Sequence, residues 1–190
     1  MDKYKCFKEL QASERLGTDY DIVSTQGKGT SVVILAPHGG DIEPRTAELA
    51  EAIAGSEFSL YCFIGKREDD NRDLHITSHN FDEPKGLALV GAHKWVVAIH
   101  GCNKKGQRVF LGGRNQLLIG KLAQALRVAG VGVETAGHEY GGTDPSNICN
   151  RGATKAGAQL ELSMAFRRGP QVERFVAAIR DVLSECQNST

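Results

Sequence analysis

The sequence predicts one α/β domain over residues 1–190, with three layers and a mostly parallel mixed sheet covered by helices on both faces. Two observations support this fold class. Apolar runs typical of strands alternate with amphipathic runs typical of helices, which is the order of a parallel sheet with crossover helices. The β-branched run at 32–36 has no polar alternation, so it predicts a central strand buried on both faces. No repeat, low-complexity tract or linker divides the chain.

The elements follow from local patterns, taken in chain order. Short apolar runs bounded by turn residues predict strands over 20–24, 32–36, 58–64, 95–99, 131–135 and 159–163. Helical periodicity with suitable start and stop residues predicts helices over 5–16, from Pro44 to Gly55, and over 84–91, 115–129 and 170–186. Residues 65–84 form a long polar connection, in which only 74–77 resembles a strand.

The composition excludes several classes of protein. Lys+Arg and Asp+Glu number 23 each, so the net charge is zero, which argues against a nucleic-acid partner. Five widely spaced cysteines, an odd number, favour free thiols over a disulfide framework. Neither a signal peptide nor an apolar run of membrane-spanning length is expected. We therefore expect a monomer with no membrane partner, cytoplasmic unless lysis releases it.

Two histidines follow buried strands at equivalent positions. His38 comes after the strand 32–36, and His100 comes after the strand 95–99. Parallel sheets bind ligands at the carboxyl ends of their strands, and Glu43 follows His38 at the start of a helix. Two imidazoles and a carboxylate with one open position form a recurring catalytic zinc shell. The sequence therefore predicts that His38, Glu43 and His100 bind Zn²⁺.

Two other interpretations of residues 37–44 remain open. His38 and Glu43 could merely cap the helix, with Gly39 and Gly40 supplying the turn. In either case we expect Asp41 to act as a helix cap or as a partner that orients a histidine. A phosphate-binding loop is the weaker alternative, because the glycine spacing matches no nucleotide-binding motif. The carboxylates of Asp41 and Glu43 would also repel phosphate.

Glu161 is the candidate general base. Alternation in the strand 159–163 places Leu160 and Leu162 on one face, and Gln159, Glu161 and Ser163 on the other. Carboxylates are depleted in strands, so a glutamate at this position suggests a function. We predict that it takes a proton from a metal-activated water. Solvent exposure on an edge strand is the alternative.

Candidate substrate contacts come from two Arg/Asn pairs and a loop histidine. Arginine binds carboxylates through a bidentate fork and asparagine adds a neutral donor. We therefore expect Arg114, Asn115, Asn150 and Arg151 to position a substrate carboxylate, unless they are ordinary surface residues. His79, in the long polar loop, is expected to contact substrate or to act as a secondary ligand.

Four stretches carry a resemblance to a known family. APHGGDIEPRT, LHITSHNFDEP, VVAIHG and QLELS occur in an order and spacing that resembles the poly-γ-glutamate hydrolases of bacteriophages and their bacterial homologues, over about residues 15–185. The resemblance implies a zinc peptidase with a carboxypeptidase-A-like fold. It also implies that His38, Glu43 and His100 are the zinc ligands and Glu161 the catalytic carboxylate.

The implied activity is hydrolysis of γ-glutamyl amide bonds in an anionic polymer. Two alternatives share the same strand-end residues. The first is a zinc deacylase of small N-acyl amino acids, whose substrate is a small carboxylate. The second is a non-catalytic module that binds carboxylate polymers and uses its metal only for structure.

Overall fold

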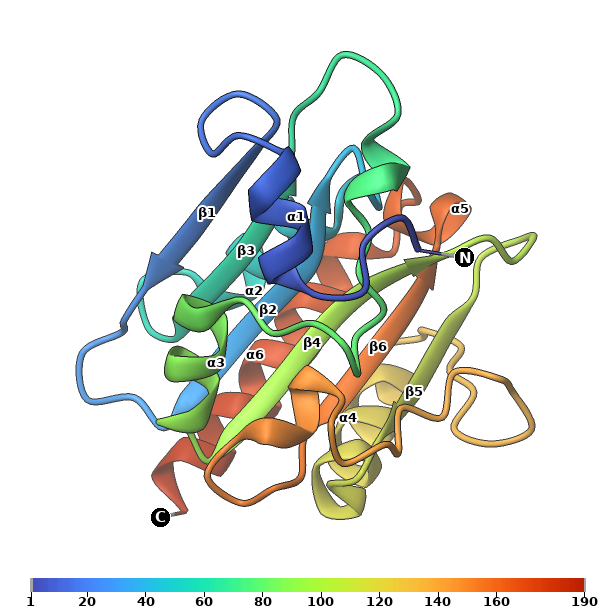
Figure 1. The fold of residues 1–190 in the computed structure, drawn as a ribbon. Coiled ribbons are helices and arrows are strands. Elements are labelled where there is room, and N and C mark those ends of the chain that lie inside the picture. Colours follow the sequence, from blue (N-terminus) through green and yellow to red (C-terminus); the bar gives the residue numbers. More distant parts are fainter. Residues whose placement is uncertain (1, 190) are drawn as a thin grey trace.

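The structure, a computed structural model, describes residues 2–189 and contains one six-stranded mixed sheet in the order β1-β3-β2-β4-β6-β5 (Figure 1). The strands are β1 (Tyr20–Thr25), β2 (Val32–Gly40), β3 (Ser59–Gly65), β4 (Trp95–Cys102), β5 (Val109–Gly113) and β6 (Ala158–Ser163). The four central strands run parallel, and the outer strands β1 and β5 are antiparallel to their neighbours. We call the edge where the central strands end the carboxyl edge, and the opposite edge the amino edge.

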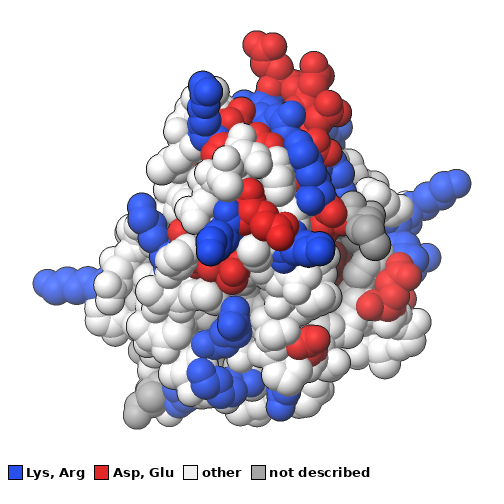
Figure 2. All heavy atoms as spheres, viewed as in Figure 1, with Lys and Arg blue, Asp and Glu red and all other residues white. Residues whose placement is uncertain are grey.

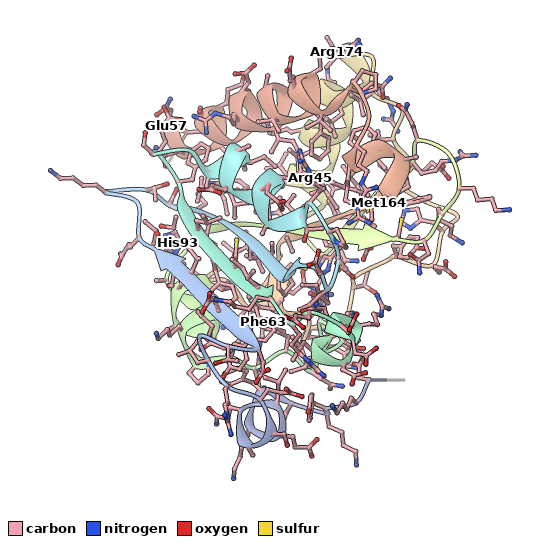
Figure 3. All side chains as sticks on the ribbon, turned by 90° about the horizontal axis from the view of Figure 1, so that it is seen from above. Arg45, Glu57, Phe63, His93, Met164 and Arg174 are labelled. Atoms are coloured by element: carbon pink, nitrogen blue, oxygen red, sulfur yellow. The ribbon has the colours of Figure 1, made fainter. Side chains whose placement is uncertain are left out.

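Helices cover both faces of this sheet, as predicted. One face packs against α2 (Thr46–Ala54), α4 (Gln116–Val128) and α6 (Val172–Asn188). The other packs against α1 (Phe7–Ser13), α3 (Pro84–Gly91) and the short 3₁₀ helices η1 (Asn71–Leu74) and η2 (Ile148–Arg151). A short helix, α5 (Met164–Arg167), follows β6. Figure 3, which views the molecule from above Figure 1, shows the sheet between the two layers, with Arg174 on the α6 side and Phe63 toward the opposite layer.

Each face of the sheet has its own apolar core. Ile34 of β2 belongs to the core under α2, α4 and α6, whereas Val33 and Leu35 belong to the core under α1 and α3. A strand with two buried faces needs apolar residues at every position, which explains the unbroken apolar run that the sequence shows at 32–36. The two-sided burial of this strand is confirmed.

Two sequence-based strands are wrong. Residues 131–135 form only an isolated bridge between Phe110 and Glu134, and the edge strand is instead β5, which the sequence analysis did not predict. All five residues of β5 are buried and pair along β6, so this segment occupies the edge. Leu74 of the strand-like segment 74–77 ends η1, and residues 75–77 form no strand; the carbonyl of Ile76 accepts a hydrogen bond from His38.

Charged side chains of both signs are interspersed on the face shown in Figure 2, in line with the balanced composition. Acidic side chains gather at the top of that view, over the loop that follows β3. The five cysteines are free thiols, and four of them are buried. Across residues 2–189, helices with the length and apolarity needed to cross a membrane do not occur.

Candidate metal centre

A β-bulge in β2 sets the direction of His38. The strand continues past Ala36, and an extra residue before Gly39 interrupts its pairing with β3. Without this bulge, alternation would place His38 on the face of Ala36, against α2. The bulge turns the ring to the opposite face, where Nε2 donates to the Ile76 carbonyl over 2.8 Å. The predicted turn at Gly39–Gly40 is therefore part of a bulged strand.

The two glycines after His38 allow close packing. A Cβ on Gly39 would lie 2.8 Å from the Cβ of Ala47 in α2. Gly40 has a φ of +63°, and a Cβ there would lie 2.1 Å from the carbonyl oxygen of Gly65 in β3. Side chains at these positions would push the bulge away from the sheet, so the glycines hold His38 in place.

A tight turn brings Glu43 back to His38. The N–H of Glu43 donates to the His38 carbonyl over 2.9 Å, and Thr46 Oγ1 donates to the carbonyls of both residues. Glu43 Oε2 consequently lies 3.3 Å from His38 Nδ1, and it accepts a 2.8 Å bond from the Gly101 N–H. The carboxylate is thus fixed by the backbone of β4, directly beside His100.

His100 completes the predicted group. Its Nδ1 lies 3.2 Å from His38 Nδ1 and 3.7 Å from Glu43 Oε2. The His38 Nε2 donates to a carbonyl, so His38 Nδ1 carries a lone pair; Ser78 Oγ lies 3.4 Å from His100 Nε2. The structure therefore brings together the three side chains that the sequence names, all of them buried. Converging nitrogen and carboxylate groups of this kind make a candidate site for a divalent metal ion.

A further histidine, His75 of the long polar connection, joins this cluster. His75 stacks on His38 with 4.0 Å between ring centroids, and its Nε2 lies 3.9 Å from Glu43 Oε1. The ligand atoms offered by His38, Glu43 and His75 all lie within 4.8 Å of one another. Burial and the neighbouring His38 lower the pKa of His75 to about 4, which keeps its ring neutral near pH 7. The candidate centre thus has four side chains.

Two carboxyl groups of the site have opposite electrostatic environments. Burial disfavours a charge on Glu43, but the His38 and His100 rings outweigh it and hold the pKa of this carboxyl well below its usual range. Glu161 pairs in register with His100 on the neighbouring strand. Burial, and then the charge of Glu43, raise the pKa of Glu161 to about 8. Two carboxyl groups with separated pKa values are typical of acid–base sites.

The predicted alternation of β6 is confirmed. Leu160 and Leu162 belong to the core, whereas Gln159 and Glu161 line a cavity of about 430 Å³. The remaining walls of the cavity come from the metal cluster, from 77–79, from 139–144 and from Asn147.

A chain of amides leads to Glu161. Asn147 Nδ2 donates to Gln159 Oε1 over 2.8 Å, and Gln159 Nε2 lies within hydrogen-bond distance of the Tyr140 carbonyl (3.3 Å) and of Glu161 Oε1 (3.4 Å). These contacts orient the Glu161 carboxyl toward the cavity. Sequence reasoning placed Gln159 on the face of Glu161 without giving it a role, although the period-two pattern was a usable signal.

Of the five predicted substrate contacts, His79 lines the cavity. Arg114, Asn115, Asn150 and Arg151 lie instead toward the amino edge. The reason is the direction of β5: it is antiparallel, so its last residue pairs with the first residue of β6. Arg114 is exposed there, and its backbone N–H donates to the Gly157 carbonyl.

Both asparagines have structural partners. Asn115 caps α4 by accepting from the Leu118 N–H. Asn150 Oδ1 accepts from the N–H groups of Arg114 and Gly157, and its Nδ2 donates to two carbonyls of the segment 142–144. An amide has two donor hydrogens and two acceptor lone pairs, so Asn150 has no free capacity for a substrate carboxylate.

Other polar residues of the stretches APHGGDIEPRT and LHITSHNFDEP lie outside the metal cluster. Asp41 is exposed and does not cap α2, whose N-cap is Arg45 with no side-chain hydrogen bond; the capping prediction is wrong. Asp82 accepts from the Phe7 N–H and Glu83 caps α3.

Sequence reasoning missed Arg167. This arginine is buried behind the site, where Nη1 donates to the Pro44 carbonyl. Its guanidinium packs where a Cβ on Gly101 would lie, 2.6 Å from the Arg167 Cζ. No local pattern distinguishes it from the other basic residues, because its position depends on how α5 folds back after β6.

Comparisons with known proteins agree with this fold. The family model of poly-gamma-glutamate hydrolase matches residues 4–173. UPF0714 protein YndL of Bacillus subtilis is 37% identical over 169 residues, which cover 88% of this chain and 66% of YndL. The SPbeta prophage-derived UPF0714 protein YoqZ of the same organism is 38% identical over 169 residues, which cover 88% of this chain and 61% of YoqZ. The chain therefore spans about two thirds of the length of these relatives.

Solved structures of similar proteins also match the fold of this chain. A bacteriophage poly-gamma-glutamate hydrolase matches with a TM-score of 0.94 and 29% identity over 100% of both chains. A zinc-free YndL structure matches with a TM-score of 0.90 and 31% identity, over 98% of this chain and 99% of that one. N-formylglutamate amidohydrolase from Ralstonia eutropha, at 11% identity and a TM-score of 0.56, shares the fold. The family resemblance is confirmed, and the chain belongs to the poly-γ-glutamate hydrolase family.

Proposed function

We propose that the protein is a zinc-dependent hydrolase of the γ-glutamyl amide bonds of poly-γ-glutamate. In this proposal His38, Glu43 and His100 bind Zn²⁺, and Glu161 is the catalytic carboxylate. One observation carries it: three potential ligand atoms converge beside a cavity that Glu161 also lines. Membership of the poly-γ-glutamate hydrolase family supports the choice of substrate.

The donor set fits zinc. Ligands about 2.0–2.1 Å from a tetrahedral ion lie about 3.4 Å from one another. The three distances among His38 Nδ1, Glu43 Oε2 and His100 Nδ1 are 3.2, 3.3 and 3.7 Å. In a tetrahedral site these three ligands leave one position for water or substrate; with His75 as a fourth ligand, the open position would be a fifth one, which zinc can use.

Zinc bound at this site would polarise the scissile carbonyl and acidify a coordinated water. Glu161 would take the proton of the attacking water and return it to the leaving amine. Burial and Glu43 raise the pKa of Glu161 to about 8 in the metal-free site; the positive charge of bound zinc would lower it toward the range in which the carboxylate can accept the proton and return it. The amide of Gln159 holds the carboxyl in place, and His79 is available to a substrate carboxylate.

A second candidate is a deacylase of small N-acyl amino acids. One observation favours it: among the described residues, those lining the cavity include Glu139 and Asp144 besides Glu43 and Glu161, but no lysine or arginine. Such a wall repels a long polyanion more than it repels one small carboxylate. We place it second because family membership supports the polymer.

The test uses the zinc-loaded protein with poly-γ-glutamate and, separately, with N-acyl-glutamates, and measures product size by gel filtration. Cleavage of the polymer supports the first candidate, and cleavage of the acyl-glutamates alone supports the second. Glu161→Gln should keep its zinc and lose turnover by about 10²–10⁴-fold. His38→Ala should lose zinc in elemental analysis.

Glu139→Gln is the matched control. It removes another carboxylate from the cavity wall. Glu139 pairs with Lys104 over 2.8 Å and takes no part in the chain of amides that leads to Glu161. Turnover should therefore stay within about threefold of that of the unmodified protein. Unchanged turnover in Glu161→Gln would contradict the catalytic assignment and favour a binding module with a structural metal.

A further inference from the structure

Asp2 reaches the candidate metal centre although it lies 73 residues before His75 in the chain. Its Oδ1 accepts a 2.8 Å hydrogen bond from His75 Nδ1. Its Oδ2 accepts two bonds of 2.6 Å, from the N–H and from the hydroxyl of Thr77. The carboxylate therefore holds the residues on both sides of Ile76, whose carbonyl in turn accepts from His38.

The segment 2–7 is fixed to the domain by several contacts. Lys3 lies 3.1 Å from Asp73, and the buried Tyr4 donates its hydroxyl to Glu14. Phe7 is buried, and its N–H donates to Asp82 over 2.6 Å. These contacts set the position of Asp2 before any ligand binds.

The bond to Asp2 selects one tautomer of His75. A carboxylate oxygen only accepts hydrogen bonds, so Nδ1 carries the ring proton and Nε2 carries the lone pair. This Nε2 is the atom that faces Glu43, at 3.9 Å from Oε1. A histidine at a metal is commonly oriented in this way, through a carboxylate on its second nitrogen.

We propose that Asp2 is a positioning residue of the metal centre, which holds His75 with Nε2 toward the metal position and so raises the affinity of the site for its ion. The inference rests on the metal site of the proposed function, but not on its substrate. Loss of a carboxylate that orients a histidine typically weakens metal affinity by about 10–100-fold, and we expect that effect for Asp2→Asn.

The experiment titrates Zn²⁺ against a chelating indicator, with the full chain. Asp2→Asn and His75→Ala should each bind zinc about 10–100-fold more weakly. The double variant should bind no more weakly than His75→Ala, because both changes act through one ring. Asp73→Asn, which removes the Lys3 contact of the same segment, should keep the unmodified affinity.

A second readout separates positioning from general stability. In metal-free protein, ¹⁵N NMR should show His75 protonated at Nδ1, and Asp2→Asn should populate the Nε2–H tautomer. Thr77→Val removes one bond to Asp2 but leaves the His75 bond, so its zinc affinity should stay within about threefold of the unmodified protein. An equal loss of zinc affinity in Thr77→Val and Asp2→Asn would overturn the inference. It would show that the anchoring of residues 75–77, and not the orientation of the His75 ring, sets the affinity.

Failure of this inference is distinguishable from failure of the proposed function. If the unmodified protein binds zinc, His38→Ala abolishes that binding and Asp2→Asn does not change it, then the inference is wrong and the metal site stands. If the unmodified protein binds no zinc, the metal site and this inference are both wrong. Absence of polymer cleavage would affect only the proposed substrate.

Discussion

The two edges of the sheet carry similar polar residues and use them differently. At the carboxyl edge, the Nδ1 atoms of His38 and His100 face the Glu43 carboxylate without backbone partners of their own. At the amino edge, Asn150 uses all four hydrogen-bonding positions of its amide on the backbone, and Asn115 caps a helix. Buried polar atoms that face one another instead of the backbone, rather than residue type, therefore distinguish the site.

The largest expected difference between the edges comes from the bulge. Gly40→Ala should lower the free energy of unfolding by about 3 kcal/mol or more, because it combines a positive φ with a Cβ 2.1 Å from a backbone oxygen. It should also weaken zinc binding, since the bulge aims His38. Urea denaturation and zinc titration measure the two effects.

Gly120→Ala is the control for that substitution. Gly120 lies in α4 with nothing within 4 Å of an added Cβ, so alanine should raise the free energy of unfolding by up to about 1 kcal/mol. A Gly40→Ala variant that gains stability, as Gly120→Ala should, would show that the bulge does not need glycine.

A pH-dependent effect should follow at the carboxyl edge. The pKa of Glu161 is about 8 in the folded state against an ordinary value of 4.5, so the folded state holds this proton more tightly than the unfolded state does. Metal-free protein should therefore lose stability as the pH rises from about 4.5 to 8, at up to ~1.4 kcal/mol per unit. Glu161→Gln removes this loss, so its advantage should grow to a few kcal/mol by pH 8.

Denaturation in a chelator at pH 4.5 and pH 8 checks this expectation. Asp144→Asn, at an exposed carboxylate of the cavity wall whose pKa is lowered by Ser146 hydrogen bonds, should show no such gain at pH 8. An equal difference between Glu161→Gln and the unmodified protein at both pH values would contradict the raised pKa.

At the amino edge, Asn150→Ala should lower the free energy of unfolding by about 2 kcal/mol or more, because it leaves buried backbone groups without partners. Asn115→Ala, which removes one helix cap, should lower it by about 1 kcal/mol. Zinc affinity should stay unchanged in both. Denaturation curves and parallel zinc titrations measure the two quantities. Loss of zinc binding in Asn150→Ala would show that the metal site at the carboxyl edge depends on the structure of the amino edge.

The smallest expected effects are those of the two arginines. Arg114→Ala and Arg151→Ala should change stability by no more than about 0.5 kcal/mol and leave KM nearly unchanged, because neither side chain lines the cavity. His79→Ala, at the cavity wall, should raise KM. Steady-state kinetics checks both, and a large rise in KM for Arg114→Ala would restore its predicted role in substrate binding.

Much of the fold could be predicted because its signals are local. The unbroken apolar run of β2, the alternation in β6 and the periodicity of α4 and α6 each reflect burial of one segment against its neighbours. The same logic placed His38 and His100 after strands whose carboxyl ends a parallel sheet brings to one edge, and Glu161 on the face of its strand opposite Leu160 and Leu162. Their convergence is observed, while their roles as ligands and base stay predictions.

The sequence by itself determined the layered parallel sheet, because burial demands a period that can be read from one segment. Only the tertiary structure decided three further features. The bulge reverses the face of His38, against the alternation of its own strand. The antiparallel direction of β5 takes Arg114 to the amino edge, away from the cavity that Glu161 lines. Asp2 meets His75 across 73 residues. Each depends on contacts between distant segments, which no local pattern records.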